Sequence, residues 1–198
     1  YQKNFFIDGG YKHAADTVIH NGAARTFFTG GNILQIDRDM PLTLLSSAVA
    51  KRGSKRHDLV AAISELEGVR VYHAGAWPED VPVKNVELCG VLDHDVLKSL
   101  MGRCHYLLHP ASKDPCPNSL IEALRFGLPA IYNPGEGSGA ELAGGYGIPL
   151  DEGDLGDTIL KAGESYMALK DKLSHECEKF GIDRAARDYY DVFKEQLG

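Results

Sequence analysis

The chain has 198 residues, 43% of them hydrophobic and 25% charged, which is the composition of a globular protein with enough apolar residues for a core. Its 28 Asp and Glu residues outnumber its 21 Lys and Arg residues, giving a net charge of −7. This acidic balance argues against a protein that binds nucleic acid, which would need clustered positive charge. No apolar run approaches the roughly 20 residues that span a bilayer, so no membrane segment is expected.

Short apolar runs alternate with stretches of helical periodicity along the chain. Strands are predicted at residues 17–20, 42–48, 69–74, 86–88, 105–109 and 129–132. Helices are predicted between them at residues 56–67, 95–103 and 118–126. Alternation at this pitch predicts an α/β fold with a parallel sheet and helices on both faces. Such sheets bind their ligands outside the carboxyl ends of the strands.

The last part of the chain has a different pattern. Residues 157–180 carry apolar side chains at helical spacing, Gly181 interrupts the pattern, and residues 183–197 carry a second stripe that includes Tyr190 and Phe193. These stripes predict two consecutive amphipathic helices that close the domain. The most loop-like segment is the glycine-rich stretch before them, at residues 135–147.

The cysteines are scattered and predict neither disulfides nor a metal site. They are Cys89, Cys104, Cys116 and Cys177. None belongs to a C-x-x-C pair, and no Cys and His spacing matches a zinc site. Free thiols in a reducing compartment are therefore expected. Cys116 lies among the candidate site residues, but no His is placed to activate it as a nucleophile.

Candidate binding residues concentrate in residues 105–142. A buried strand is followed by a loop with three prolines, and then Asn118 and Ser119 suit the start of a helix. The free backbone N–H groups of Asn118, Ser119 and Leu120 would form an anion site, which the helix dipole would strengthen. This part of the sequence therefore predicts a phosphate-binding helix N-terminus.

Two carboxylates accompany this anion site. Glu122 comes one turn after Asn118, about 6 Å along the helix axis, which is similar to the separation of a phosphate and the ribose hydroxyls in a nucleotide. A carboxylate can accept hydrogen bonds from two vicinal hydroxyls. Asp114 precedes the helix in the loop, and Gly137 and Gly139 follow the next strand, where glycine lets backbone approach a ligand closely. We expect these groups to meet in one crevice at the strand ends.

Several motifs, in the same order, resemble the donor-binding half of retaining GT-B glycosyltransferases of the large "glycosyl transferases group 1" family. The E-x₇-E motif of that family is matched by Asp114-x₇-Glu122, with Asp in the first acidic position. The run CPNSLIEALRFGLPAI resembles the family run "PNsllEAmacGlPvi". Further matches are VIHNGA at 18–23, VELCGVLDHDVLKSLMGRC at 86–104, HPAS at 109–112 and GSGAEL at 137–142.

The resemblance implies a role for each matching residue. Glu122 would bind the ribose, Asp114 would bind the donor sugar, and Lys55 would neutralise the leaving diphosphate, so these three are the expected catalytic residues. The other expected donor-binding residues are Asn118, Ser119, Leu120, Lys51, Arg52, His109, Gly137, Ser138 and Gly139. The donor would be a nucleoside-diphosphate sugar, and neither a metal nor another cofactor is expected.

The match has departures that leave alternatives open. The family has a Gly-Arg and then a Lys-Gly after its first strand; here Arg56 replaces the second Gly, and the Arg position is Ala48 or shifts into Lys51 and Arg52. The basic cluster could be a solvated loop, Asp114 a turn residue, and His109 a packing residue. Two alternatives remain for the function of the chain. One is a sugar-nucleotide epimerase of the same architecture, and the other is a non-catalytic interaction module with a degenerate donor site.

The resemblance also implies how the chain is organised. Residues 1–16 would be a terminal helix or linker from a missing N-terminal domain, residues 17–180 the nucleotide-sugar-binding domain, and residues 181–198 a closing helix. The enzyme would transfer a hexose-type sugar to a hydroxyl in glycan or polysaccharide synthesis. Its acceptor, a glycan or a lipid-linked glycan, would bind the missing domain, so this part would bind donor without full activity. A cytoplasmic location is expected, with the full-length enzyme peripheral at the membrane as the alternative.

Overall fold

Six parallel strands form one sheet in the computed structural model of this chain, which describes residues 18–27 and 40–197. The strands are β1 Leu42–Ala48, β2 Val69–Gly75, β3 Val86–Gly90, β4 Tyr106–His109, β5 Ala130–Tyr132 and β6 Gly147–Pro149. Their order in the sheet is β3-β2-β1-β4-β5-β6, and every pairing is parallel. The expected linker at residues 1–16 lies outside the described residues.

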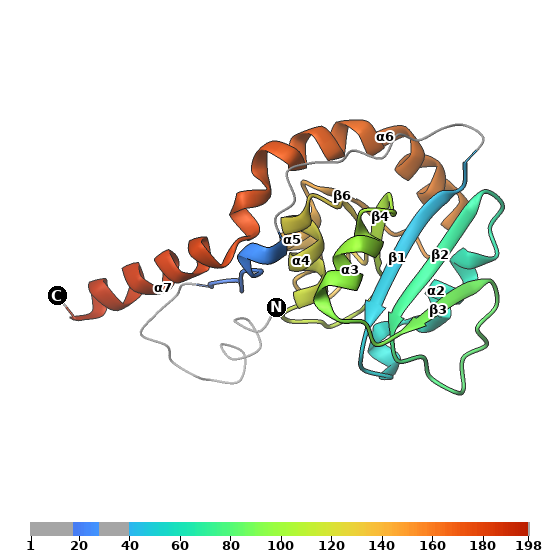
Figure 1. Cartoon of the computed structure of the whole chain (residues 1–198), viewed down its shortest axis with the longest axis horizontal. Coiled ribbons are helices and arrows are strands. Elements are labelled where there is room, and N and C mark those ends of the chain that lie inside the picture. Colours follow the sequence, from blue (N-terminus) through green and yellow to red (C-terminus); the bar gives the residue numbers. More distant parts are fainter. Residues whose placement is uncertain (1–17, 28–39, 198) are drawn as a thin grey trace.

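Helices cover both faces of this sheet, as predicted (Figure 1). The α-helices are α2 His57–Ser64, α3 His94–Met101, α4 Asn118–Phe126, α5 Gly139–Ala143, α6 Leu155–Glu176 and α7 Ile182–Leu197. Short 3₁₀ turns are η1 Arg25–Phe27, η2 Gly53–Lys55 and η3 Cys177–Phe180. One core cluster joins α2 and the first half of α6 to the sheet, and a second joins α3, α4 and α5 to its other face. The α/β prediction is therefore confirmed.

Strand β4 lies between the two core clusters and contributes side chains to both. All four of its residues are buried, because β1 and β5 flank it and helices cover both of its faces. Leu107 packs with the α3 and α4 cluster, whereas Tyr106 and Leu108 pack with the α2 and α6 cluster, as the alternation of side chains along a strand requires. The Tyr106 hydroxyl donates a hydrogen bond to the Ala162 carbonyl over 2.7 Å, which fastens α6 to the sheet.

The strand predicted at residues 17–20 is wrong for the residues that the structure describes. Val18, Ile19 and His20 carry no regular structure, and Ala23 instead forms an isolated parallel bridge with Gly181. The backbone of this segment is engaged elsewhere: Arg184 donates to the carbonyls of His20 and Asn21, and the Ala23 N–H donates to the Phe180 carbonyl, so the segment lies against the joint before α7 and not against β3 or β6, the outer strands of the sheet. The glycine-rich stretch was also misjudged, since it contains α5 and leads into β6.

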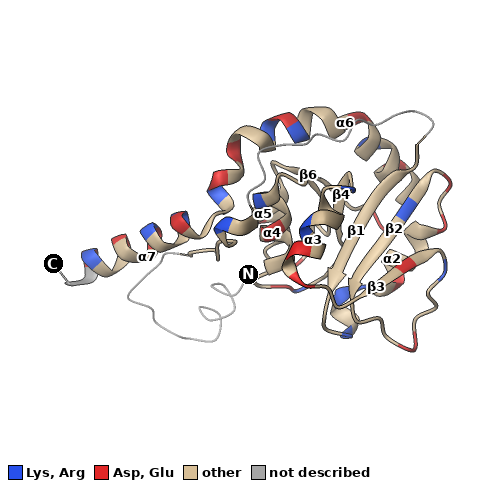
Figure 2. Cartoon of the chain, in the orientation of Figure 1, with Lys and Arg blue, Asp and Glu red and all other residues tan. Residues whose placement is uncertain are grey.

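Helix α7 forms where it was predicted, but most of it does not close the domain. Only its first turn packs against the rest of the domain, where Ala185 is buried. The helix then runs away from the sheet (Figure 1). Tyr190 and Phe193, which belong to the predicted apolar stripe, are 66% and 62% exposed. Charged residues of both signs are distributed along α6 and α7 (Figure 2). Periodicity identified an apolar face, but it did not identify what that face contacts.

Two loops at the carboxyl end of the sheet are joined to each other outside it. Asp114, after β4, and Gly137, after β5, form an isolated parallel bridge. The Ser138 N–H donates to the Asp114 carbonyl over 2.9 Å, and Ser138 Oγ donates to the Pro115 carbonyl over 2.8 Å. Gly137 has a φ of +129°, and a Cβ atom at this position would lie 2.9 Å from the backbone N and O of Asp114. Only glycine allows this approach.

Two histidines are buried with Trp77 beside α2. The His57 and His73 ring centroids are 5.1 Å apart, and they lie 5.1 and 5.0 Å from the Trp77 ring. His73 is fully buried, and its Nδ1 lies 3.2 Å from Ser46 Oγ. Burial lowers the pKa of His73 from its ordinary 6.5 to about 4, and it also lowers the pKa of His57. The folded protein therefore holds both rings neutral at neutral pH.

Replacing Gly137 with Ala should destabilise the joined loops. The new methyl group would press on the Asp114 backbone, and the positive φ disfavours any side chain, so we expect the free energy of unfolding to fall by about 1–3 kcal/mol. Urea denaturation measures this. Gly53→Ala is the control, because a Cβ at Gly53 would have no heavy atom within 4 Å. Equal and small changes in both variants would contradict the close approach.

The free energy of unfolding should fall as the pH is lowered from about 6.5 toward about 4. In this range the unfolded chain takes up protons on histidine at its ordinary pKa, whereas His73 stays neutral until about pH 4 in the folded chain. The His73→Asn variant should therefore show a flatter slope, by about one proton, in urea denaturation at a series of pH values. His175→Asn on the exposed surface of α6 is the matched control. An unchanged slope in His73→Asn would contradict the neutral buried ring.

Candidate functional site

A cavity of about 400 Å³ lies at the carboxyl ends of the central strands. Of the residues singled out from the sequence, it is lined by Lys55, Asp114, Asn118, Ser119 and Glu122. They come from η2, from the loop after β4 and from the first turns of α4. Its volume is within the range of ligand pockets, and its position beside β1 and β4, where the strand order reverses, is where α/β sheets bind ligands.

Lys55 and Asp114 meet directly across this cavity. Lys55 Nζ donates to Asp114 Oδ2 over 2.6 Å, and the two side chains are 27% and 14% exposed. The other carboxylate oxygen, Oδ1, accepts a weaker hydrogen bond from the Cys116 N–H over 3.3 Å. A lysine ammonium has further N–H donors beyond the one used here. The pair therefore places a cation in the cavity that can also donate to an anionic ligand.

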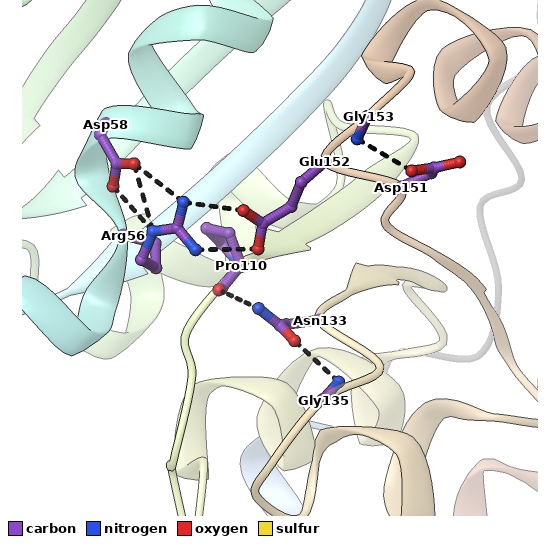
Figure 3. Close-up of polar contacts among 8 residues, drawn as sticks. All are labelled: Arg56, Asp58, Pro110, Asn133, Gly135, Asp151, Glu152 and Gly153. Atoms are coloured by element: carbon purple, nitrogen blue, oxygen red, sulfur yellow. Dashed lines mark hydrogen bonds and ion pairs between the residues drawn. The ribbon is translucent and has the colours of Figure 1, made fainter.

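Arg56 supports the turn that carries Lys55. It has a φ of +53° and a ψ of +49°, the left-handed conformation that favours glycine. This is the position at which the resembling family has Gly. The Arg56 guanidinium lies between two carboxylates: it contacts Asp58 on α2 and makes a bidentate pair with Glu152, at 2.8 and 3.0 Å (Figure 3). The turn is thereby tied to the loop that precedes α6.

A second set of contacts shapes the loop after β5. The Asn133 side-chain amide donates to the Pro110 carbonyl over 3.1 Å, and its Oδ1 accepts from the Gly135 N–H over 2.8 Å (Figure 3). Asn133 thus connects the start of the loop after β4 with the start of the glycine-rich loop. These bonds and the Asp114–Gly137 bridge hold the two loops in one arrangement.

The N-terminus of α4 differs in detail from the sequence expectation. Pro117 is the N-cap residue, so Asn118 and Ser119 lie in the first turn instead of capping it. The Leu120 N–H already donates to the Pro117 carbonyl over 3.0 Å, and the Leu120 side chain is fully buried in the core. The backbone N–H groups of Asn118 and Ser119 remain as the ones suited to an anion.

Glu122 lines the cavity one turn deeper in α4. Its side chain is partly buried, and this burial raises the pKa of the carboxyl group, while nearby His94 lowers it. His94 lies at the first position of α3 and lines the same cavity. The carboxylate is therefore placed where it can accept hydrogen bonds from ligand hydroxyls, at the distance from the anion site that the helix dictates.

The remaining predicted residues do not line the cavity. Lys51 is exposed, with its Nζ 3.5 Å from Glu79, and Arg52 is also exposed. His109 is buried, which lowers the pKa of its ring to about 4, and Gly139 lies against the ring, where a Cβ would be 4.0 Å from His109 Cδ2. Gly137 and Ser138 contact the Asp114 loop, as described above, so their observed role is to hold that loop.

Sequence reasoning missed the apolar and backbone parts of the cavity wall. Val91, Leu92 and Leu97 contribute an apolar side, and Gly75 lies at the end of β2. Gly75 has a φ of +131°, and a Cβ there would lie 1.9 Å from the Ala48 carbonyl oxygen, so this close contact needs glycine. The signal available in the sequence was a glycine at the end of each of two strands, β2 and β3, because strand ends border the crevice in this fold.

Residues 18–27 and 40–197 contain neither a cluster of metal-ligating side chains nor a helix that could span a membrane. No group of three or more His, Cys, Asp or Glu side chains is arranged there to hold a metal ion. None of the helices in these ranges is long and apolar enough to cross a membrane. All four cysteines are free thiols, with Cys104 and Cys177 buried, as the sequence predicted.

Comparisons with known proteins identify the fold. No protein-family model matches the chain, and no curated protein matches it by sequence. Among solved structures, the chain is similar to Anabaena HepE in complex with UDP, with a TM-score of 0.74 and 15% identity over 98% of this chain and 61% of that one. It is similar to sucrose-phosphate synthase from Thermosynechococcus elongatus, with a TM-score of 0.72 and 15% identity over 99% of this chain and 56% of that one.

A third similar structure is WaaG, a glycosyltransferase involved in lipopolysaccharide biosynthesis. Its TM-score is 0.66, with 20% identity over 89% of this chain and 55% of that one. The chain thus corresponds to between 55% and 61% of the length of these three proteins. It has the Rossmann-like fold that is found in GT-B glycosyltransferases.

Proposed function

We propose that the chain is the C-terminal, donor-binding domain of a retaining GT-B glycosyltransferase of the group 1 family. The observation that carries this proposal is the cavity itself. Lys55, Asp114, Asn118, Ser119 and Glu122, which the motifs single out, line one cavity at the carboxyl ends of the strands. The complex of HepE with UDP, a protein of similar fold, supports a nucleoside diphosphate as the ligand class.

The diphosphate would lie against the first turn of α4. The N–H groups of Asn118 and Ser119 would donate to its oxygens, and the positive end of the helix dipole favours the negative charge. Lys55 would donate from the other side, while its contact with Asp114 keeps the ammonium in place. As the bond between sugar and diphosphate breaks, charge grows on the leaving phosphate, so these groups would stabilise the transition state more than the bound donor.

The nucleoside would extend along α4 from the phosphates. The Glu122 carboxylate would accept hydrogen bonds from both ribose hydroxyls. Beyond it, Val91 and Leu92 offer an apolar wall for the face of the base. Asp114 would bind hydroxyls of the sugar on the opposite side of the phosphates. Lys55, Asp114 and Glu122 are therefore the residues we assign to catalysis, with no metal or other cofactor.

The complete reaction would need more than this chain. We propose transfer of a hexose-type sugar, with retention at its anomeric carbon, to a hydroxyl of a glycan or a lipid-linked glycan. The acceptor would bind an N-terminal domain, and this part would bind donor without full activity. The location of the whole enzyme would be cytoplasmic, or peripheral at the membrane.

Isothermal titration of the chain with UDP, GDP and ADP should detect binding of at least one of them at millimolar affinity or tighter. The Glu122→Gln variant should weaken this binding about tenfold, because an amide replaces a charged acceptor of two hydrogen bonds. Glu164→Gln is the matched control: Glu164 is exposed on α6 and does not line the cavity. The Lys55→Met variant should weaken diphosphate binding while leaving uridine binding, followed by NMR, unchanged.

The outcomes separate the proposal from a degenerate or unrelated site. No binding of any nucleoside diphosphate at millimolar concentration would overturn it. Equal effects of Glu122→Gln and Glu164→Gln would remove Glu122 from the ligand site. A Lys55→Met variant that loses affinity for uridine as much as for UDP would show that Lys55 acts on the fold and not on the phosphates.

A further inference from the structure

Residues 20–23, here called the strap, run beside the donor cavity without belonging to the sheet. The side chain of Asn21 reaches α4, which lines the proposed donor site, and the side chain of His20 reaches α5, which lies next to the loop of Asp114. His20 Nε2 lies 3.3 Å from Glu141 Oε2 on α5, the helix within the glycine-rich stretch. Asn21 Nδ2 donates to Asn118 Oδ1 over 3.1 Å, in the first turn of α4. The strap therefore touches both helices whose N-terminal ends are near Asp114.

The backbone of the strap is fixed on the joint between α6 and α7. The Ala23 N–H donates to the Phe180 carbonyl over 2.8 Å, and the Ile182 N–H donates to the Ala23 carbonyl over 2.9 Å. Gly22 packs so closely that a Cβ there would lie 2.5 Å from the Gly181 carbonyl oxygen. These contacts give the strap one position on the joint. No residue larger than glycine fits at position 22.

Arg184 in the first turn of α7 completes this attachment. Its Nη2 donates to the carbonyls of His20 and Asn21 over 2.9 and 3.0 Å. Its Nη1 donates to Asp188 over 2.8 Å, and its Nε donates to the Lys179 carbonyl over 3.0 Å. The guanidinium is planar and its donors have fixed directions, so it sets the backbone of the strap where the Asn21 side chain begins.

The first turn of α4 has no side-chain cap of its own, and the strap contacts it through Asn21. Its N-cap is Pro117, and no side chain caps its free N–H groups. The Asn118 side chain is held instead by Asn21, and its Oδ1 also faces Cys116 Sγ at 3.8 Å. Since the N–H groups of Asn118 and Ser119 would bind the diphosphate, the orientation of this turn matters for the donor.

We propose that Asn21 and Arg184 are positioning residues for the donor site. Arg184 fixes the strap, and the strap acts through Asn21 on Asn118 and so on the anion-binding turn. Neither residue lines the donor cavity, so neither would touch the diphosphate. The inference rests on the proposed function of that cavity as a nucleoside-diphosphate site. It adds that the first turn of α7, distant in sequence, controls the geometry of that site.

A double-mutant cycle on UDP affinity tests the route of this control. Asn21→Ala and Arg184→Ala should each raise the Kd for UDP about three- to tenfold. The double variant should have a Kd for UDP no higher than that of the single variant with the higher Kd, because both changes act through the same contact of the strap with Asn118. Arg25→Ala is the matched control: it removes the exposed pair of Arg25 with Asp183 at the same joint but has no contact with Asn118. If Arg184→Ala does not fold, Arg184→Lys replaces it in the cycle.

The reactivity of Cys116 gives a second measurement that needs no nucleotide. Cys116 is partly exposed and shares Asn118 Oδ1 with Asn21, so loosening the turn should raise its rate of alkylation by iodoacetamide about twofold or more. Mass spectrometry of the modified peptides measures the rate, with partly exposed Cys89 in β3 as the internal reference. Arg25→Ala should leave the Cys116 rate unchanged.

These measurements distinguish the two proposals. If the unmodified chain binds UDP but Asn21→Ala and Arg184→Ala bind it equally well, the positioning role is overturned. Additive losses in the cycle, together with equal losses of thermal stability, would also overturn it in favour of a purely structural role. If the unmodified chain binds no nucleoside diphosphate, the proposed function fails, and the alkylation rates alone decide whether the strap orients the turn.

Discussion

The site depends on the divergence of two neighbouring strands. β1 and β4 are paired in the middle of the sheet, but the helices that follow them pack on opposite faces: α2 belongs to one core cluster and α4 to the other. The chain must therefore leave the two strands in opposite directions, which opens a crevice between their carboxyl ends. Lys55 stands on one side of it and Asp114 on the other. Their contact at 2.6 Å spans the opening that the topology creates.

The sheet was predictable from sequence because its strands are short, apolar and separated by periodic helices. Residues 42–48 and 118–126 were predicted with the bounds that the structure has, since each has strong local signals at both ends. The failures have a common physical cause. The run predicted as a strand at residues 17–20 has the composition of a strand, but His20 and the residues after it bond to Arg184 and Phe180 and not to an outer strand of the sheet. The glycines of residues 135–147 conceal β6, where a Cβ on Gly147 would lie 2.2 Å from the Ala130 carbonyl oxygen. Tertiary contacts determine the conformation of both segments, and such contacts cannot be read from local sequence patterns.

The candidate site was predictable to the extent that helix geometry determines it. The spacing of Asn118 and Glu122 on one helix sets their separation, and the structure places both in the cavity. Loop residues were less predictable, because a charge in a loop has no periodicity that shows which way it points. Lys55 and Lys51 belong to one basic cluster, yet the first lies in the cavity and the second pairs with exposed Glu79. The sequence also gave no sign that Asn21 contacts Asn118, since their separation of 97 positions is bridged only by the fold.

The left-handed turn at Arg56 has a consequence for how related sequences can vary. A side chain in this conformation is strained by about 1 kcal/mol or more relative to glycine, and here the bidentate pair with Glu152 accompanies it. Glycine would relieve the strain but could not hold the acidic loop before α6. Homologues with Gly at position 56 are therefore free to lose the acidic residue at position 152, whereas those with Arg at position 56 are expected to keep it. The two positions, 96 residues apart, should covary as a pair.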